Sequence, residues 1–488
     1  MNSTDRPQFA GVEAAGTLDP EDWDEFSRLA HEALDMIVEH TRALSLRPVW
    51  QQTPQRTLDR FSKQLPRASR DFASVLDDIR SDILPYGTGN GHPSFFGWVH
   101  GGGTPYGMVA EMLAAGLNAN CGGRNHVAIE VERQIARWAA QMLDYPTCAS
   151  GLFVTGTSMA NFMALLVARD AALGHEVRHS GICGAPQLVG YASAQAHGCI
   201  GQAFELSGIG SDWLRKIDVD ASGRMILAAL QREVIADRQA GRKPFLVIGT
   251  AGTGNTGAID DLEGIARIAD QEGLWFHVDG AFGALAALSP RLRPLLRGIE
   301  RSRSVAFDFH KWAHVPYDAG FLLVREGQMH RSTFASPAAY LQRLPRGLGS
   351  GDIWPCDLGP DLSRGFRALK VWTTIQTLGA DRIASAIEKC CDLAAHLEDR
   401  LRRSDFFEPA AQVRLNVVCF RLRDRPSSQA HETIVMELQE RGIAAPSTTT
   451  LHGMTVIRAA IVNHRTLRSH VDGLIDAAEE CARRLPRA

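Results

Sequence analysis

The sequence predicts an α/β protein built around a mostly parallel β-sheet with helices on both faces. Helical and strand-like segments alternate from about residue 104 onward, as they do in folds assembled from βαβ units. Several strands are short apolar runs, such as 274–279, which is typical of strands buried on both faces of a parallel sheet. Polar residues suited to chemistry follow these strands, at the edge where α/β sheets bind ligands.

The part before residue 90 shows helical periodicity only. Residues 1–19 are expected to be loose, and amphipathic helices are predicted over 20–45 and 68–82, with a proline-containing connection over 48–66. Two such helices cannot bury their apolar faces alone. We therefore expect them to pack on another surface, such as a second subunit.

The central and C-terminal parts differ in the order of their elements. In the central part, helices are expected near 105–118, 127–143, 158–173, 222–236 and 261–272, and strands near 151–155, 187–191, 245–250, 274–279, 304–309 and 320–325. After a helix near 364–378, the expected order is helix 381–403, strand 413–422, helix 429–441, strand 455–462 and helix 466–484. We therefore divide the chain into an N-terminal helical dimerisation segment (1–90), a large α/β domain (91–378) and a small α+β domain (379–488).

Composition excludes several classes of function. Hydrophobic residues make up 45% and charged residues 22% of the 488, and the net charge is −3, so the chain is not a basic nucleic-acid binder. We find no run of 18 apolar residues, no secretory leader and no zinc-like spacing of His and Cys, so neither a membrane nor a metal is expected. The nine cysteines are an odd number without C-x-x-C pairs, which indicates a cytoplasmic protein with reduced thiols.

A lysine and an aspartate lie at two of the strand ends. Lys311 is one of only six lysines, and it is bracketed by aromatic residues, where desolvation favours a neutral, nucleophilic amine. Asp279 ends the strand 274–279. Each has an ordinary alternative: a surface lysine, and a helix-capping or buried acid. Together they are the pair that pyridoxal phosphate (PLP) needs, with the lysine holding its aldehyde and the aspartate its protonated ring nitrogen.

Two further strand ends carry polar residues. Thr157 and Ser158 join the strand near 151–155 to a helix, and small hydroxyl residues at a helix N-terminus form an anion site. His197 follows the strand ending near 191 and could stack on a planar cofactor or transfer a proton. A plain helix cap and a surface histidine are the alternatives.

The segment 252–257 fits the dinucleotide pattern G-x-G-x-x-G, with Asp279 further along the chain. In that fingerprint the helix opens inside the glycine run. Here four residues intervene, and the next helix is expected to start near Asp260 or Asp261. We therefore reject a nicotinamide site and interpret this segment as a turn.

These features together resemble the group II PLP-dependent decarboxylases, the aromatic-L-amino-acid decarboxylase family of fold type I. The resemblance runs from about residue 20 to the C-terminus. The segments that carry it are 92–97 (HPSFFG), 130–132 with Trp138, 156–161 (GTSMAN), 195–197 (QAH), 250–253 (TAGT), 277–281 (HVDGA), 310–312 (HKW) and 363–370 (SRGFRALK).

The resemblance implies a fold, an oligomeric state and a role for each residue. It implies a seven-stranded, mostly parallel sheet in the large PLP-binding domain, and a homodimer whose N-terminal helices wrap the partner and whose active site lies at the subunit interface. Lys311 would carry the internal aldimine, Asp279 would pair with the ring nitrogen, and His197 would stack on the ring. The remaining implied cofactor contacts are Thr157, Ser158 and His310 at the phosphate, Thr250 or Thr253 at the ring, and Ala281.

The expected reaction is loss of CO₂ from an L-amino acid, with an aromatic one expected, to give an amine. The family's loop tyrosine, which supplies a proton, is missing from 345–357, and Tyr340 lies before that loop. Related enzymes without this tyrosine use oxygen to form aldehydes, so oxidative aldehyde synthesis is the alternative. Transamination is a further alternative, with Arg458 as a carboxylate ligand. A non-catalytic cofactor-binding relative is another, and a nicotinamide oxidoreductase is the weakest.

The substrate pocket differs from the family pattern. We assign Phe95, Trp98, His100 and Trp354 to it. Position 98 is bulkier than usual, and His100 stands where smaller or neutral residues are common. A polar cluster between Asn118 and His126 could also line the cleft, so a polar or acidic substrate side chain stays open beside an aromatic one.

Overall fold

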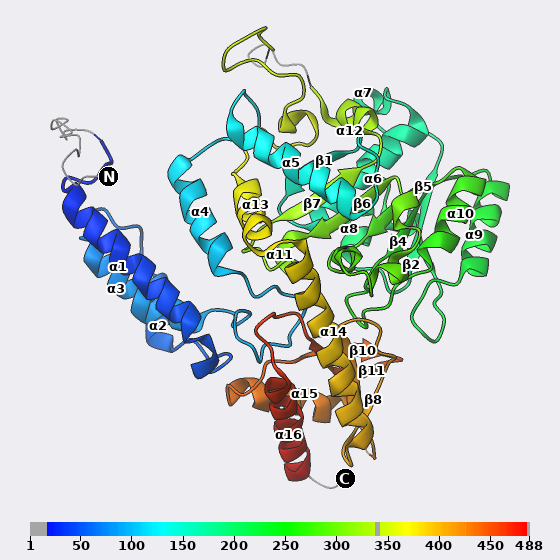
Figure 1. The fold of residues 1–488 in the computed structure, drawn as a ribbon. Coiled ribbons are helices and arrows are strands. Elements are labelled where there is room, and N and C mark those ends of the chain that lie inside the picture. Colours follow the sequence, from blue (N-terminus) through cyan, green and yellow to red (C-terminus); the bar gives the residue numbers. More distant parts are fainter. Residues whose placement is uncertain (1–16, 337–341, 425, 486–488) are drawn as a thin grey trace. The chain divides into compact units, whose positions relative to one another are not determined.

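The computed structural model describes residues 17–336, 342–424 and 426–485 (Figure 1). Two compact units make up the chain. The first comprises the described residues up to Arg47 together with Gln51–Thr88, and the second comprises Pro48–Trp50 and the chain from Gly89 onward. None of the helices in the described ranges has the length and apolar character needed to cross a bilayer.

The first unit is helical. Its elements are α1 (Trp23–Arg42), α2 (Gln55–Phe61), α3 (Phe72–Asp78), a π-helical turn η2 (Ile79–Ile83) and the 3₁₀ turns η1 (Leu44–Leu46) and η3 (Leu84–Tyr86). Asp22 caps α1 by accepting hydrogen bonds from two backbone N–H groups of the first turn. The two predicted helices are therefore present, while the short α2 lies in the segment predicted to be only a connection.

The second unit contains a seven-stranded sheet. Its strands are β1 (Ser150–Val154), β2 (Leu188–Ser193), β3 (Leu214–Ile217), β4 (Lys243–Thr250), β5 (Trp275–Asp279), β6 (Ser304–Asp308) and β7 (Gly320–Val324). The order is β1-β7-β6-β5-β4-β2-β3, and only β7 pairs antiparallel with its neighbours. The predicted fold class is confirmed, although the sequence pattern had not revealed β3.

Helices cover both faces of this sheet. One face carries α6 (Thr157–Leu173), α7 (Val177–Ser180), α8 (Cys199–Leu206) and α12 (Gly327–Phe334), and the other carries α5 (Val127–Met142), α9 (Leu227–Gln239) and α10 (Leu262–Glu272). Helices α13 (Arg367–Leu378) and α4 (Pro105–Leu117) pack outside α5 and α13 respectively. Successive residues of β5 point to opposite faces, so Trp275 joins the core under α6 whereas Phe276 joins the core under α10.

A smaller antiparallel sheet forms the C-terminal part of the second unit. Its elements are α14 (Ala380–Arg403), β8 (Phe407–Pro409), β9 (Val417–Leu422), α15 (Ser428–Glu440), β10 (Ser447–Leu451), β11 (Met454–Ala460) and α16 (Arg468–Arg484). The strand order is β10-β11-β9-β8. The long helix α14 runs from the large sheet to the small one (Figure 1).

Short helical turns connect the larger elements. They are α11 (Phe309–Trp312) and the 3₁₀ turns η4 (Ser211–Trp213), η5 (Gly283–Leu288), η6 (Arg293–Leu296), η7 (Ile299–Arg301) and η9 (Pro355–Asp357). Helix α10 begins after Asp261, whose carboxylate accepts a hydrogen bond from the Gly264 N–H at 2.9 Å. The helix thus starts well past the glycine run 252–257, as the argument against a dinucleotide site required.

Candidate active site

A cavity of about 530 Å³ lies at the carboxyl ends of the central strands. Its walls come from the residues that follow β1, β2, β4, β5 and β6, and from β10 and β11 of the small sheet. It is therefore built where an open α/β sheet binds its ligands, between the two sheets of the second unit. Lys311, Asp279, His197, Thr157 and Ser158 all line it.

Lys311 lies on α11, directly after β6. Its Nζ atom is 2.9 Å from Oδ2 of Asp308, and its side chain is 21% exposed. The other carboxylate oxygen of Asp308 accepts a hydrogen bond from the Thr157 N–H at 2.8 Å. Asp308 therefore lies within ion-pair distance of the lysine amine and also contacts the first turn of α6.

Asp279 lies at the end of β5 with only 3% of its surface exposed. Its Oδ2 accepts a hydrogen bond from Asn161 Nδ2 at 3.2 Å, and its Oδ1 accepts one from the Ala281 N–H at 3.2 Å. Burial raises the pKa of this carboxyl above its ordinary value, while the positive charge of Lys311 and these hydrogen bonds act in the opposite direction. A cationic ligand group at the free side of the carboxylate would stabilise its ionised form.

The N-terminus of α6 opens onto the cavity. Gly156 is its N-cap residue, and no side chain of the cap residue occupies the first turn. Thr157 Oγ1 is buried and has no hydrogen-bond partner among the described residues. Gly320 of β7 permits the close approach of this turn, because a Cβ atom there would lie 2.4 Å from the Gly156 Cα. The turn presents hydroxyl and N–H donors, as an anion site requires.

The two predicted histidines differ in their surroundings. His197 lies in the exposed turn between β2 and α8, and its Nδ1 accepts a hydrogen bond from the Cys199 N–H at 3.2 Å. His310 is buried, and its Nδ1 accepts a hydrogen bond from the Ala319 N–H at 3.0 Å. Burial lowers the pKa of His310 to about 4, so its ring is neutral and its Nε2 carries the proton.

The two candidate threonines are not equivalent. Thr250 lines the cavity, and its buried Oγ1 has no partner within the described part of the chain. The hydroxyl of Thr253 instead accepts a hydrogen bond from the Ala258 N–H at 3.1 Å and lies 3.1 Å from that of Thr256. Thr253 thus stabilises its own turn, whereas Thr250 and Ala281 face the cavity.

The four residues assigned to the substrate pocket separate into three groups. Trp98 and His100 line the cavity, with their rings stacked 5.7 Å apart. Phe95 is buried behind them and stacks on His100 at 5.9 Å. Trp354 does not line this cavity, since its ring is buried between the guanidinium groups of Arg124 and Arg343, at 4.9 and 3.5 Å.

Asp308 and Tyr317 are site residues that the sequence argument did not identify. Asp308 could have been noticed as an acid three residues before Lys311, one helical turn away. Tyr317 carries no such signal, because it follows an irregular segment. Its ring lies 4.3 Å from that of His310, and although 48% of the residue is exposed, partial burial raises the pKa of its phenol to about 12. Tyr340, by contrast, lies outside the described residues.

Arg458 lines the cavity but is already engaged. Its guanidinium donates to the carbonyl oxygens of Gly254, Asn255 and Trp98 and to the Ser447 hydroxyl. These four bonds use four of the five N–H groups of the guanidinium. The arrangement favours a structural role over the carboxylate clamp that a transaminase would need.

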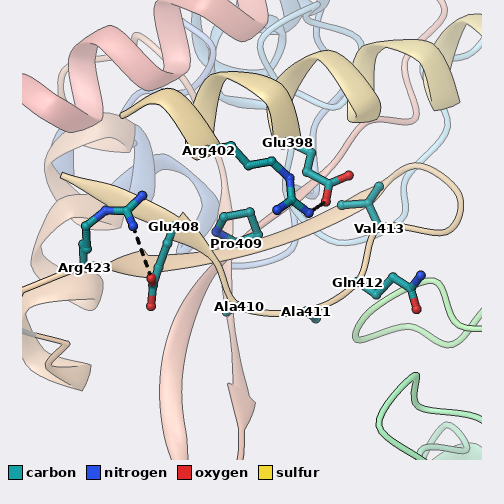
Figure 2. Close-up of a pocket in the computed structure, with 9 residues that line it drawn as sticks. All are labelled: Glu398, Arg402, Glu408, Pro409, Ala410, Ala411, Gln412, Val413 and Arg423. Atoms are coloured by element: carbon teal, nitrogen blue, oxygen red, sulfur yellow. Dashed lines mark hydrogen bonds and ion pairs between the residues drawn. The ribbon is translucent and has the colours of Figure 1, made fainter. Parts of the chain in front are cut away.

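A second hollow lies on the small sheet, beneath α14 (Figure 2). Its charged side chains form the pairs Arg402–Glu398 and Arg423–Glu408. The charges therefore cancel within the hollow, and no nucleophile or unpaired acid faces it. Among the described residues no group of three or more His, Cys, Asp or Glu is arranged to hold a metal.

The conserved domain of pyridoxal-dependent decarboxylases matches residues 54–423. The chain is also 33% identical over 456 residues to an aromatic-L-amino-acid decarboxylase from Bacillus atrophaeus, a match that covers 91% of this chain and 92% of that protein. The fold and the site define a PLP-type α/β enzyme. The chain belongs to the pyridoxal-dependent decarboxylase family, and it is a PLP-dependent amino-acid decarboxylase.

Two further relatives bear on the details. A phenylacetaldehyde synthase from Arabidopsis thaliana is 28% identical over 476 residues, covering 93% of this chain and 95% of that protein. A crystal structure of Oryza sativa TDC with PLP and tryptamine superposes with a TM-score of 0.88 at 26% identity, covering 96% of this chain and 99% of that one. Relatives of this chain therefore include both decarboxylases and aldehyde synthases.

The residues of the cavity fit PLP. An amine, a buried carboxylate and the N-terminus of α6 occupy one cavity, as the aldehyde, ring nitrogen and phosphate of this cofactor require. The two orphaned hydroxyls, Thr157 Oγ1 and Thr250 Oγ1, give the fit independent support. Buried polar atoms without partners are uncommon in folded proteins, and a bound polar ligand would satisfy both.

Proposed function

We propose that this enzyme removes CO₂ from an aromatic L-amino acid to form the corresponding amine, with Lys311 as the residue that holds the cofactor. The observation that supports this proposal most strongly is the presence of Lys311 and Asp279 at neighbouring strand ends in one cavity. The relative from Bacillus atrophaeus, named an aromatic-L-amino-acid decarboxylase, supports the choice of substrate class.

Each residue of the cavity has a distinct proposed task. PLP, when bound, supplies an aldehyde that takes up the substrate amine and a ring that accepts electrons from Cα. Lys311 would bind the aldehyde carbon and give it up to the substrate. Asp279 would keep the ring nitrogen protonated, Thr157 and Ser158 would bind the phosphate, and His197 would lie over the ring.

The wall of the cavity supports an aromatic substrate. Trp98, His100, Phe282 and Tyr317 all contribute rings to it. Offset or edge-on contacts between aromatic rings add about 1 kcal/mol to what burial alone provides. Thr448, Thr449 and Asn255 also line the cavity and would suit a hydroxyl or indole N–H on the ring of the substrate.

The product is an amine or an aldehyde depending on whether a residue of the cavity supplies a proton to Cα. The segment 345–357 has no tyrosine, but His197 and Tyr317 both line the cavity. A tyrosine phenol keeps its proton at neutral pH, and the raised pKa of Tyr317, about 12, preserves that state. Protonation from either residue gives an amine. If neither group delivers a proton, the alternative outcome is oxidative: the amino acid, O₂ and water would give an aldehyde, CO₂, ammonia and hydrogen peroxide.

We further propose that the enzyme is a homodimer whose active site lies at the subunit interface. Helix α4 supports this, because one of its faces leaves Tyr106, Val109, Met112, Leu113 and Leu117 exposed in the single chain. A contiguous apolar surface of this kind is typical of an interface. The division into a dimerisation segment (1–90), a PLP-binding domain (91–378) and a small domain (379–488) remains a prediction.

A cytoplasmic location is also proposed, with no nucleic acid or membrane as partner. It is supported by the state of the nine cysteines, all of which are free thiols in the structure. Reduced thiols are the rule in the cytoplasm.

The decisive experiment is product analysis. Cofactor-loaded enzyme would be incubated in air with the standard amino acids and dopa, and the products identified by mass spectrometry. An amine that has lost one CO₂ is the expected product, and an aldehyde with peroxide would establish the alternative. Lys311→Ala should abolish turnover, whereas Lys216→Ala, at an exposed position on β3, should not. Turnover by Lys311→Ala at the wild-type rate would contradict the proposal.

A further inference from the structure

A chain of buried polar side chains lies beneath the cavity, behind Asp279. It consists of Asp279, Asn161, His277, Ser304 and Trp275, each at most 3% exposed. The last four are not part of the cavity wall. Burying these four polar side chains in the core costs free energy unless each one has a hydrogen-bond partner, so their arrangement requires an explanation.

The fold brings these side chains together by register. Trp275, His277 and Asp279 are alternate residues of β5 and therefore point to the same face of the sheet, the one covered by α6. Asn161 lies in the second turn of α6, above them. Ser304 is the partner of His277 in the pairing of β5 with β6.

The hydrogen bonds form one continuous path. Trp275 Nε1 lies 2.8 Å from Ser304 Oγ, and Ser304 Oγ lies 2.8 Å from His277 Nδ1. His277 Nε2 lies 2.8 Å from Asn161 Oδ1. Asn161 Nδ2 then donates to Asp279 Oδ2 at 3.2 Å and also to the Cys199 sulfur at 3.5 Å.

With Asp279 ionised, one set of donors and acceptors satisfies this path. Asn161 must turn its NH₂ toward the carboxylate, because its carbonyl there would face the ionised Asp279, which can only accept. Its carbonyl then faces His277, so His277 Nε2 carries the proton and Nδ1 accepts from the Ser304 hydroxyl. Ser304 in turn accepts from Trp275, whose indole N–H can only donate. Burial lowers the pKa of His277 to about 3, so the ring remains neutral and carries a single N–H.

The path thus ends at the Asn161 NH₂ group, which is held in place to donate a hydrogen bond to Asp279. Without it, the Ala281 N–H would be the remaining hydrogen-bond donor to that carboxylate among the described residues. A hydrogen bond to the charged form of an acid favours ionisation, and burial opposes it. The ionised form is the one that can hold a protonated ring nitrogen.

We propose that His277, acting through Asn161, is a positioning residue that orients Asp279 and keeps it ionised toward the cofactor ring nitrogen. This inference rests on the proposed role of Asp279. His277 touches neither substrate nor cofactor. It acts by fixing the direction of the Asn161 amide, which in turn fixes the carboxylate.

Two amide substitutions of His277 test the roles of its two ring nitrogens separately. In His277→Gln the terminal amide can replace the Nε2 donor to Asn161, whereas in His277→Asn the shorter amide can replace only the Nδ1 side toward Ser304. We expect His277→Gln to bind PLP within about threefold of wild type and His277→Asn to bind it about tenfold or more weakly, as loss of one buried charge-assisted hydrogen bond implies. The affinity is measured by absorbance titration of the full-length apoenzyme.

A cofactor analogue distinguishes positioning from general damage to the fold. In 1-deaza-pyridoxal phosphate a carbon replaces the ring nitrogen, so Asp279 has no partner on it. The proposal predicts that His277→Asn and wild type bind this analogue equally well. It also predicts that the ¹⁵N chemical shift of ring-labelled PLP moves toward that of neutral pyridine in His277→Asn and stays at the wild-type value in His277→Gln.

The control is His330→Asn, another buried histidine, whose Nδ1 lies 2.7 Å from Ser150 Oγ away from the cavity. It should lower thermal stability without changing PLP affinity. Equal weakening of PLP and the deaza analogue by His277→Asn, or an unchanged ¹⁵N shift, would overturn the inference. If His277→Asn does not fold, Trp275→Phe and the ¹⁵N shift of His277→Gln still test it. Failure of wild type to bind PLP at all would instead refute the proposed function.

Discussion

Arg364 and Glu132 form a buried ion pair between the segment before α13 and helix α5. The Arg364 guanidinium donates to both carboxylate oxygens of Glu132, at 2.6 and 3.1 Å, and to the carbonyl oxygens of Cys121 and Phe153, at 2.9 and 2.8 Å. Both charged side chains are at most 6% exposed. In Arg364→Met, the Phe153 N–H, at 3.2 Å, would be the one hydrogen-bond partner left to Glu132 within the described ranges.

The cost of this substitution follows from what it leaves buried. Removing one partner of a buried ion pair destabilises a protein by about 3–5 kcal/mol, because the other charge remains without compensation. The two carbonyl oxygens that also lose a donor add about 1 kcal/mol each. We therefore expect Arg364→Met to lower the free energy of unfolding by roughly 5–7 kcal/mol, if the carboxylate remains charged.

Urea unfolding of the apoenzyme, followed by tryptophan fluorescence, measures this loss. The matched control is Arg402→Met, since Arg402 is 64% exposed and pairs with Glu398 on α14. Exposed pairs contribute about 0–1 kcal/mol. The double variant Glu132→Leu/Arg364→Met should recover most of the loss, because no charge is left unpaired. A similar small cost for Arg364→Met and Arg402→Met would refute the reasoning.

Three other predictions concern acid stability, product and assembly. Burial lowers the pKa of His277 to about 3 and that of His330 to about 4. Between pH 6.5 and 4 the unfolded chain therefore binds more protons at these two residues than the folded chain, and stability is lost as the pH falls. Burial raises the pKa of Asp260 to about 6, so this carboxyl binds its proton more tightly in the folded chain and offsets about one of those protons. The free energy of unfolding of the apoenzyme, measured in urea, should therefore fall on acidification from pH 6 to 5. These three groups contribute about 1.4 kcal/mol of the loss. The lowered pKa values of His310 and His464, about 4 each, add to it, and no change would contradict the assignment. Tyr317→Phe should raise the ratio of aldehyde to amine, measured in air by mass spectrometry, if the phenol supplies the proton at Cα; an unchanged ratio would assign that proton to another group. Leu113→Glu on the exposed face of α4 should yield monomers by light scattering with little turnover, and an active, undisturbed dimer would exclude this face from the interface.

Local patterns predicted most of the fold. The long helices and the buried strands β1, β2 and β4 to β7 carry strong periodicity or continuous apolar runs, which neighbouring residues alone make visible. The strand β3, with Arg215 and Lys216 at its centre, and the short strands β8 and β10 lack such runs. Their pairing depends on partners distant in the sequence, so no local signal could identify them.

The sequence predicted those residues of the candidate site that are chemically reactive or polar and directly follow a strand. Lys311, Asp279 and Thr157 each follow a strand, and parallel strands bring their carboxyl ends to one edge. The contacts between these residues were not predictable. Asp308 approaches both Lys311 and the α6 turn because α11 begins directly after β6, and Trp354 turns away because two arginines enclose its ring. Side-chain direction in such turns is set by packing across the fold.

Attachment of the cofactor to a lysine tests the central claim most directly. Borohydride reduces an imine between PLP and a lysine to a stable secondary amine, which leaves the mass of the reduced cofactor on one peptide. With only six lysines in the chain, peptide mapping by mass spectrometry identifies the site without ambiguity. The account predicts the added mass on Lys311 alone. Labelling of Lys370 or another lysine, or no labelling of protein reconstituted with PLP, would contradict it.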